Sequence, residues 1–261
     1  MSAAQKSPPL PGTRPEGSRD EREASARVRE MFTRIAPRYD FLNHLLSFSL
    51  DHLWRRRTAR RFAEILRRPE ARVLDVCCGT GDLALALDRL RPRAVPGAAI
   101  PRAIVGSDFV EPMLTRAREK AGEAARPLEF AAADALRLPF AGASFDLLTT
   151  AFGFRNLANY EDGLREFARV LKPGGEVGIL EFTEPSGAMG GLFRFYFRRI
   201  LPRIGGAISG NSEAYRYLPG SVAKFPSPPE LSALMVRTGF TNVRIASWNF
   251  GSVVLHSARR A

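Results

Sequence analysis

Arg72–Ala84 reads RVLDVCCGTGDLA, and this stretch decides the fold of the chain. Its apolar first half predicts a short buried strand, Gly79 and Gly81 predict a turn, and Asp82 begins a helix. Glycine has no Cβ, so such a turn reaches positive φ and lets the backbone approach a ligand closely. The helix presents unpaired N–H groups and the positive end of its dipole. This order predicts a nucleotide- or nucleoside-binding unit, with a plain strand-to-helix turn as the alternative.

The charges around the turn narrow the class of ligand. Gly79, Gly81 and Ala84 match the G-x-G-x-x-G/A fingerprint of dinucleotide sites, which is a weak signal by itself. However, Asp75 lies in the strand and Asp82 directly follows the second glycine, where a carboxylate would repel a pyrophosphate. A cationic ligand fits this pattern better. The charges therefore favour S-adenosylmethionine, with its ammonium and sulfonium groups, over NAD.

Size and composition indicate a cytoplasmic enzyme. The 261 residues suit one globular domain with appendages, and 45% of them are apolar. The chain has no apolar run of about eighteen residues, as a membrane span requires, and its N-terminus lacks the apolar core of a signal peptide. Cys77 and Cys78 are the only cysteines. Two adjacent thiols cannot hold a metal ion alone, so we expect them to pack as small side chains.

The net charge of +12 comes almost entirely from arginine. This excess reflects either a compositional bias or an acidic partner, which would be nucleic acid or an anionic membrane surface. Residues 1–20 are rich in Pro, Gly, Ser and charge and predict a disordered arm. Residues 21–68 predict a helical cap with helices over 21–35, 39–46 and 50–67. Basic and apolar residues alternate over Trp54–Arg61, which indicates a membrane-binding face or a solvated outer surface.

After the cap, strands and helices alternate, which predicts a parallel sheet with helices on both faces. Asp108 ends the second strand, where a carboxylate grips ribose hydroxyls in nucleoside-binding α/β folds. Residues 184–226 interrupt the alternation of strands and helices and predict an inserted helical segment. Two closely joined strands follow and predict a hairpin. The predicted fold is Rossmann-like α/β, with a seven-stranded, mostly parallel sheet that ends in a C-terminal antiparallel hairpin, an arrangement typical of methyltransferases. The predicted strands are 73–76, 103–107, 128–132, 145–151, 176–182, 241–249 and 251–258; the predicted helices between and after them are 82–90, 111–125, 161–171, 189–204, 212–217 and 228–238.

From about Arg27 to the C-terminus the chain resembles the ubiquinone/menaquinone biosynthesis C-methyltransferases, a branch of the class I S-adenosylmethionine-dependent enzymes. The glycine turn and the LKPGG stretch identify only the superfamily. More specific are the Tyr39, Asp40 and Asn43 set in the predicted cap, FGFRN and the YRYL…FP stretch. The matching stretches are RIAPRYDFLNHLLS (Arg34–Ser47), LDVCCGTGDLA (Leu74–Ala84), DALRLPF (Asp134–Phe140), FGFRN (Phe152–Asn156), RVLKPGGEVGILEF (Arg169–Phe182) and YRYLPGSVAKFP (Tyr215–Pro226).

The chain departs from the family pattern at three places. Where the family has Gly-x-His-Arg-x-Trp, this chain reads SLDHLW over Ser49–Trp54, so Asp51 stands in place of the histidine. Ala151 stands where some members have a serine that contacts the cofactor. Cys77 and Cys78 stand where smaller residues are common.

The resemblance implies S-adenosylmethionine as the methyl donor and no metal ion. By motif, Asp108 would accept hydrogen bonds from the ribose hydroxyls and Asp134 from the adenine amino group, although Asp134 also suits a turn cap. Asp82 and Asp75 would either face the methionine ammonium or stabilise the glycine turn. The implied cofactor-binding residues are Gly79, Thr80, Gly81, Asp82, Asp108, Asp134 and Ala135.

The resemblance also implies methylation of a ring carbon on a demethylated prenyl quinol. A carbon nucleophile needs an electron-rich ring, so the substrate would be the reduced hydroquinone. The implied catalytic residues are Arg155, Asn156 and Tyr39. Arg155 would hold the phenolate or a water that acts on the phenol, with a salt bridge to a nearby acid as the alternative. Tyr215 and Tyr217 would line the quinol pocket or pack as core aromatics, and we expect His44 and His52 to be structural.

The favoured substrate is demethylmenaquinol, and the benzoquinol precursor of ubiquinone is the alternative. A non-catalytic RNA-binding protein on the same fold is the rival class, although the sequence shows no nucleic-acid motif. We expect Trp54–Arg61 and Phe193–Arg203 to dock on an anionic membrane, which would place the protein at the inner face of the cytoplasmic membrane. The oligomeric state is open, with a homodimer among the alternatives.

Overall fold

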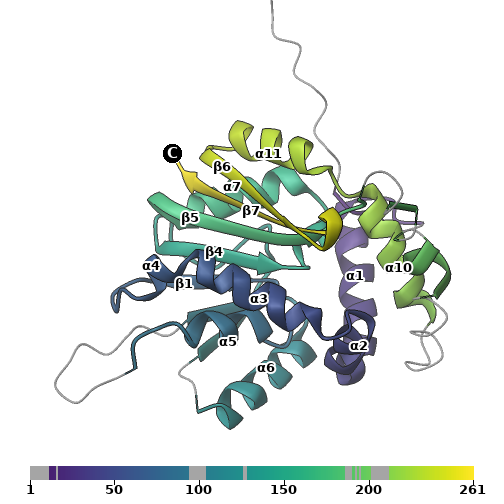
Figure 1. The fold of residues 1–261 in the computed structure, drawn as a ribbon, viewed down its shortest axis with the longest axis horizontal. Coiled ribbons are helices and arrows are strands. Elements are labelled where there is room, and N and C mark those ends of the chain that lie inside the picture. Colours follow the sequence, from purple (N-terminus) through teal and green to yellow (C-terminus); the bar gives the residue numbers. More distant parts are fainter. Residues whose placement is uncertain are drawn as a thin grey trace, which may run out of the picture.

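One seven-stranded sheet organises the protein (Figure 1). The computed structural model describes residues 12–15, 17–93, 104–125, 128–185, 190–191, 193, 195–200 and 212–261. The strand order is β3-β2-β1-β4-β5-β7-β6, and only β7 runs antiparallel to its two neighbours. This order confirms the predicted fold class. The strands are β1 (Val73–Val76), β2 (Ile104–Asp108), β3 (Leu128–Ala132), β4 (Phe145–Ala151), β5 (Leu171–Phe182), β6 (Phe240–Trp248) and β7 (Val253–Arg260).

Helices cover both faces of the sheet and create two cores. On one face, α3 (Leu50–Arg61) and α5 (Asp82–Asp88) pack on Val73 of β1. On the other face, α7 (Tyr160–Val170) and α11 (Pro228–Arg237) share a second apolar core with Leu74 and Val76. Successive side chains of a strand point to opposite faces of the sheet, so the residues of β1 contribute side chains to the helical layers on both faces. α6 (Glu111–Glu123) packs beside them against β2 and β3.

The predicted cap and the inserted segment gather at one edge of the sheet. α1 (Glu21–Ile35), α2 (Tyr39–Leu46) and α10 (Ser212–Lys224) lie beyond the carboxyl end of β4, at the right of Figure 1. Asp20 caps α1 by accepting a hydrogen bond from the Glu23 N–H at 2.8 Å. Ligands of open α/β sheets bind at the carboxyl edge of the strands, so the cap stands where such a ligand would be enclosed.

Three predicted boundaries are wrong in an informative way. The third cap helix ends at Arg61 and a short α4 (Ala63–Leu66) follows, because the helix is interrupted at buried Phe62. β5 begins at Leu171 rather than at residue 176, since the KPGG stretch forms an irregularity between two paired parts of one strand. α10 continues to Lys224, seven residues beyond the predicted end, with Pro219 inside it.

One residue of the predicted N-terminal arm packs against the domain. Residues 1–11 lie outside the described residues, but Thr13 is buried. Its hydroxyl donates a hydrogen bond to the Arg155 carbonyl at 2.5 Å and lies 3.1 Å from the Tyr160 hydroxyl. Most of the predicted helix over 189–204 also lies outside the described residues, and Tyr196–Ile200 is a single wide helical turn. No helix of the described ranges is long and apolar enough to cross a bilayer.

Candidate functional site

The glycine turn after β1 has the conformation that its sequence predicts. Gly79 has φ of +54° and Gly81 has φ of +84°, where other residues are strained. A Cβ on Gly81 would lie 3.3 Å from the Cβ of Ala117 on α6. The Gly79 N–H donates a hydrogen bond to Asp108 Oδ2 at 2.9 Å. The carboxylate at the end of β2 therefore holds the turn at the end of β1.

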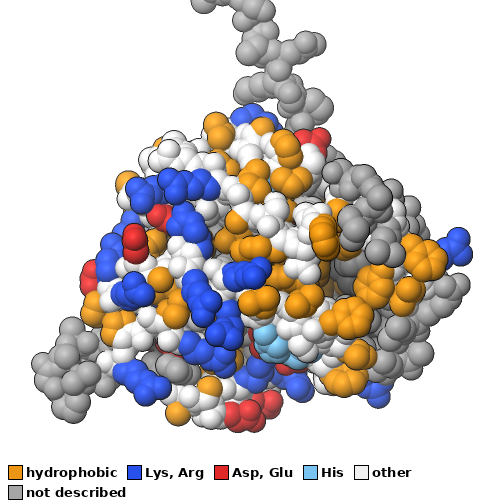
Figure 2. Space-filling model, in the orientation of Figure 1, with side chains coloured by type: hydrophobic (Ala, Val, Ile, Leu, Met, Phe, Trp, Pro, Cys, Tyr) orange, Lys and Arg blue, Asp and Glu red, His pale blue; other side chains and the backbone are white. Residues whose placement is uncertain are grey.

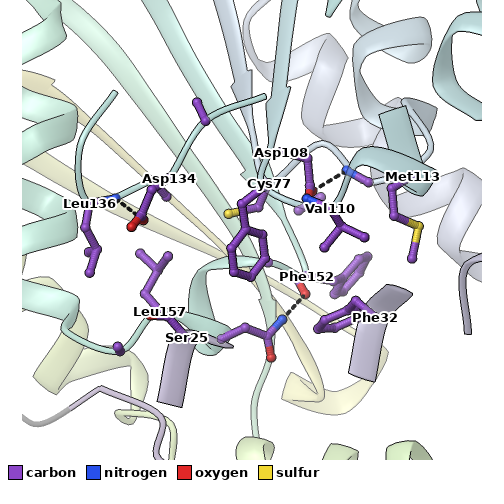
Figure 3. Close-up of a pocket in the computed structure, with 18 of the residues that line it drawn as sticks. Ser25, Phe32, Cys77, Asp108, Val110, Met113, Asp134, Leu136, Phe152 and Leu157 are labelled. Atoms are coloured by element: carbon purple, nitrogen blue, oxygen red, sulfur yellow. Dashed lines mark hydrogen bonds between the residues drawn. The ribbon is translucent and has the colours of Figure 1, made fainter. Parts of the chain in front are cut away.

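The first of three neighbouring cavities, the Asp108 pocket, lies above this contact (Figure 3). Asp108 is buried, and its second oxygen accepts a hydrogen bond from the Val110 N–H at 2.9 Å. Burial raises the pKa of this carboxyl, and the backbone N–H donors oppose the rise. Side chains from α1 close the opposite side. The lining includes Ser25, Phe32, Tyr39, Cys77, Gly79, Asp108, Met113, Asp134, Ala135, Phe152, Asn156 and Leu157.

The predicted pair Asp134–Ala135 lines the same pocket. Asp134 is exposed, and its Oδ1 accepts a hydrogen bond from the Leu136 N–H at 2.9 Å. The turn cap is therefore present, and binding of adenine by Asp134 stays a prediction that its place in the lining allows. Cys77 lines the pocket too, and burial raises the pKa of its thiol well above the ordinary value. Cys77 therefore lines the pocket as a small, uncharged side chain, as expected from the sequence.

The second cavity, the Asp82 pocket, lies at the start of α5 and is lined by the predicted cofactor residues Thr80 and Asp82, whereas Gly81 is not among its lining residues. Burial opposes ionisation of Asp82, but Arg55 and Lys120 outweigh burial and lower its pKa. Lys120 of α6 forms an ion pair with Asp82 and lies 3.2 Å from both Asp40 Oδ2 and Thr80 Oγ1. The Thr80 hydroxyl also donates to Asp40 at 2.5 Å. These contacts tie the cap, the glycine turn and α6 together.

Asp75 is the most deeply buried acid of the Asp82 pocket, with 1% of its surface exposed. Its Oδ1 accepts a hydrogen bond from the Thr149 hydroxyl at 2.8 Å. Its Oδ2 is buried with no hydrogen-bond partner among the described residues. Burial raises the pKa of Asp75 to about 7, and the Thr149 hydroxyl opposes the rise. Asp75 supports the strand end, and its second oxygen remains available to a ligand donor.

The third cavity, the Arg155 pocket, lies between the cap and the loop after β4. Arg155 is buried and forms an ion pair with Glu181 of β5, with Nη1 2.7 Å from Oε2. The salt bridge considered from the sequence is therefore present, yet the side chain still lines the cavity, and its Nε has no partner among the described residues. The other lining residues include Met31, Phe32, Ile35, Tyr39, Asn43, Asp51, Arg55, Phe152, Phe182 and Tyr217.

Tyr39 joins the three cavities, since it lines the Asp108, Asp82 and Arg155 pockets alike. Burial raises the pKa of its phenol, and Arg155 opposes that rise. Asn156, the third predicted catalytic residue, accepts a hydrogen bond from the Tyr217 hydroxyl at 3.1 Å. Tyr217 therefore belongs to the site, whereas the side chain of Tyr215 lies outside the described residues.

His44 and His52 lie at the edge of the Arg155 pocket around Asp51. Their rings stack with centroids 4.2 Å apart, and His44 Nδ1 lies 2.8 Å from Asp51 Oδ2. The three side chains could offer ligand atoms to a metal ion within 4.8 Å of one another. However, Asp51 already forms an ion pair with Arg55 and accepts a hydrogen bond from the Ser47 hydroxyl at 2.8 Å. The absence of a metal from the reaction stays a prediction.

The basic stretch Trp54–Arg61, predicted to form a membrane-binding face or a solvated outer surface, begins with two buried residues. Trp54 and Arg55 are 4% and 8% exposed, so neither belongs to an outer face. The indole N–H of Trp54 donates to Asn249 Oδ1 at 3.0 Å. Arg55 turns inward to Asp51, and the spacing of an acid four residues before an arginine was the available signal. No pattern around Lys120 pointed to its contacts with Asp82 and Asp40.

Comparison with known proteins identifies the family of the chain. Residues 20–260 match the model of the ubiE/COQ5 methyltransferase family. The demethylmenaquinone methyltransferase of Deinococcus radiodurans is 49% identical and aligns with 89% of this chain and 92% of its own length. The Thermus thermophilus protein of the same name is 50% identical over 88% of this chain and 100% of its own.

Another similar relative is the ubiquinone/menaquinone biosynthesis C-methyltransferase of Geobacter sulfurreducens, which is 44% identical over 91% of this chain and 90% of its own. Among solved structures, a methyltransferase of Thermotoga maritima has a TM-score of 0.62 at 18% identity, over 89% of this chain and 99% of its own, and it shows the fold alone. The family match and the identities decide the enzyme class. The chain is an S-adenosylmethionine-dependent methyltransferase and belongs to the ubiE/COQ5 methyltransferase family.

Proposed function

We propose that the protein methylates a ring carbon of reduced demethylmenaquinone to form menaquinol. The printed names of the Deinococcus and Thermus relatives support this substrate. The observation that carries the proposal is the position of Tyr39 at the junction of the three pockets. A donor bound at Asp108 and Asp82 would meet, beside Tyr39, a ring bound near Arg155.

The residues present fit S-adenosylmethionine. The glycine turn with its positive φ angles leaves backbone room beside Asp108, and Asp75 keeps one buried oxygen unpartnered. Asp108 would hold the ribose, the Asp134–Ala135 pair would hold the adenine, and Thr80 and Asp82 would hold the amino-acid end. When bound, the donor supplies a methyl group already activated as a sulfonium.

The Arg155 pocket suits a hydroquinone that must lose a phenolic proton. A phenol titrates near pH ~10 in water, so a cation near the oxygen is needed to favour the phenolate at neutral pH. Arg155 forms an ion pair with Glu181, and its buried Nε–H has no partner in the described part of the chain, which supports a role in binding that oxygen or a water that removes the proton. Phe152 and Phe182, stacked 4.6 Å apart, and Phe32 would keep water from the ring.

A defined assay tests this proposal. Purified protein with methyl-labelled S-adenosylmethionine should transfer label to chemically reduced demethylmenaquinone and more slowly to the demethylated benzoquinol. Arg155→Met combined with Glu181→Gln avoids an unpaired buried charge and should lower kcat by about 100-fold or more, as for a lost transition-state donor. Arg165→Met, at an exposed position of α7, serves as the control. Label in neither quinol, or full activity of the double variant, would contradict the proposal.

Docking on an anionic membrane forms part of the same proposal. Phe41, Leu45 and Phe48 are exposed around α2 and are named here the apolar tip. Arg56, Arg57 and Arg60 are exposed on one side of α3 and are named the basic face. Figure 2 shows Lys and Arg side chains gathered over α3, with hydrophobic side chains beside them toward α2.

Aromatic side chains beside arginines favour an anionic bilayer surface. Asn43 and Ser47 line the Arg155 pocket from the same helix and turn, so a prenyl tail would leave the pocket beside the apolar tip. The basic face keeps Arg56, Arg57 and Arg60 of the predicted Trp54–Arg61 stretch. Docking through it and the apolar tip would bring the protein to the inner face of the cytoplasmic membrane. Membership of an enzyme family disfavours the RNA-binding alternative, and a homodimer stays a prediction.

A further inference from the structure

Arg55 is the one arginine of the sequence RRR at 55–57 that points into the protein. It is 8% exposed, whereas Arg56 and Arg57 are exposed. Its guanidinium lines both the Asp82 pocket and the Arg155 pocket. A buried cation of this kind requires anionic or hydrogen-bonding partners to offset its desolvation. The contacts of Arg55 therefore indicate what the residue is placed to bind.

The guanidinium has more N–H groups than its protein partners use. Nη1 forms an ion pair with Asp51, on the side of the Arg155 pocket. Nη2 lies 3.9 Å from Asp82 Oδ2, which is beyond hydrogen-bond distance. The planar group also lies above the Phe152 ring, with its central carbon 5.6 Å from the centroid. Arginine has five N–H donors in a rigid fork. The N–H groups of Nη2 can therefore still donate to an oxygen in the Asp82 pocket.

The Asp82 pocket combines opposite charges over a short distance. Among its lining residues, Arg55 is the only cation, and Asp75 and Asp82 are the acids. Lys120 lies outside the lining, where it forms ion pairs with Asp82 and Asp40. A group that carries one ammonium and one carboxylate would satisfy both signs. The α-amino-acid end of S-adenosylmethionine is such a zwitterion.

We propose that Arg55 binds the carboxylate of the amino-acid end of S-adenosylmethionine, while Asp82 faces its ammonium. This inference rests on the proposed function for the identity of the donor. A phenolate of the quinol is the other anionic oxygen within reach, since Arg55 also lines the Arg155 pocket. The carboxylate is the better match because Nη1, which faces that pocket, is already bound to Asp51, and the freer Nη2 edge faces Asp82.

Two ligands that differ only in the carboxylate test the inference. S-adenosylmethionine and its decarboxylated analogue are titrated by calorimetry into the wild type and into Arg55→Met, with no quinol present. Arg55→Met should weaken S-adenosylmethionine by about 30- to 100-fold, as expected for a charged bidentate contact, and change the analogue less than about twofold. Arg55→Lys should lose about tenfold for the carboxylate ligand, because it keeps the charge but not the fork. Arg67→Met, at an exposed position directly after α4, should match the wild type.

A second pair of variants covers the case in which Arg55→Met fails to fold because Asp51 is left unpaired. Asp51→Asn is compared with Asp51→Asn/Arg55→Met, and the same selective loss is expected between them. An equal loss for both ligands would assign Arg55 a structural role, and an unchanged affinity for S-adenosylmethionine would move it to the quinol. Either result overturns the inference. If the wild type binds both ligands but methylates no quinol, the proposed function fails and this inference stands.

Discussion

Asp108 supports the glycine turn through its own hydrogen bonds to Gly79 and Val110. The same carboxylate lines the Asp108 pocket, where we expect it to accept hydrogen bonds from the ribose. Asp108→Ala should weaken S-adenosylmethionine about 10- to 100-fold, since charged hydrogen bonds contribute roughly one to three kcal/mol. Equilibrium dialysis measures the change. Glu119→Ala, at an exposed position of α6, is the control, and an unchanged affinity would remove Asp108 from the site.

Asp75 makes the stability of the fold depend on pH. Its pKa lies near 7 in the folded protein because of burial, against an ordinary value of 3.8. Between those values the folded state holds a proton that the unfolded state has lost, so the free energy of unfolding falls as pH rises from about 4 to about 7. Above pH 7 this contribution is fully lost and the dependence levels off.

The variant Asp75→Asn should remove that dependence. The amide oxygen still accepts from Thr149 but carries no charge. We therefore expect Asp75→Asn to stabilise the protein at pH 8 relative to the wild type, and to do so much less at pH 5. Urea unfolding at the two pH values measures the difference. An equal effect at both would mean that Asp75 is ionised in the folded state throughout.

Single residues in sequence motifs were easier to predict than the residues that they contact in the fold. Asp108 was predicted from its place at the end of a parallel strand, and the family motif added Asp134, which follows the next strand along the chain. Arg155 was predicted from its place after β4, but its partner Glu181 lies 26 residues away on β5. Arg55 was assigned to an outer surface because a periodic pattern does not say which member of an arginine run turns inward. Long-range pairs of this kind depend on packing.

The break between α3 and α4 depends on a glycine in the central strand β5. Phe62 occupies the break and packs on Gly178, where an added Cβ would lie 2.6 Å from the ring. The periodicity of the sequence continued through Phe62, so the predicted helix ran on to residue 67. The sheet below the helix, rather than local propensity, sets its end.

Two glycine substitutions with opposite expected signs test this account. Gly178→Ala should destabilise the protein by about 1–3 kcal/mol through overpacking against Phe62. Gly122→Ala, in α6 with open space around its Cα, should stabilise it by about 0.5–1 kcal/mol. Thermal unfolding measures both. Adding Phe62→Leu should restore part of the loss from Gly178→Ala, and failure of that rescue would place the strain elsewhere.

The strands and helices whose bounds were predicted best are those with a single clear pattern in the sequence. β3 and β4 have the predicted bounds, because turn residues or charged residues enclose a short apolar run on both sides. The KPGG stretch was predicted to end a helix, which it does after Val170, but not to form an irregularity inside β5. The pairing of Phe145 of β4 with Leu171 of β5, before that stretch, is a tertiary feature, and no local pattern encodes it.

For the whole molecule, the uneven distribution of charge and exposed aromatic residues predicts how the protein meets a bilayer. The wild type should float with anionic vesicles of phosphatidylglycerol at low salt and be released as salt screens the basic face. Phe41→Ser/Phe48→Ser should abolish flotation at intermediate salt. Val236→Ser removes an equally exposed apolar side chain on α11 and should float like the wild type. Vesicle binding that ignores the apolar tip would refute this orientation.

The buried threonine that precedes α1 has a practical consequence for anyone who trims the chain. A version that starts at Glu21, the predicted domain boundary, keeps every strand of the sheet but loses the anchor of Thr13 on the Arg155 carbonyl. We expect such a shortened enzyme to melt within a few degrees of the intact one and yet turn over more slowly. Side-by-side melting curves and initial rates would reveal whether these leading residues serve the reaction rather than the fold.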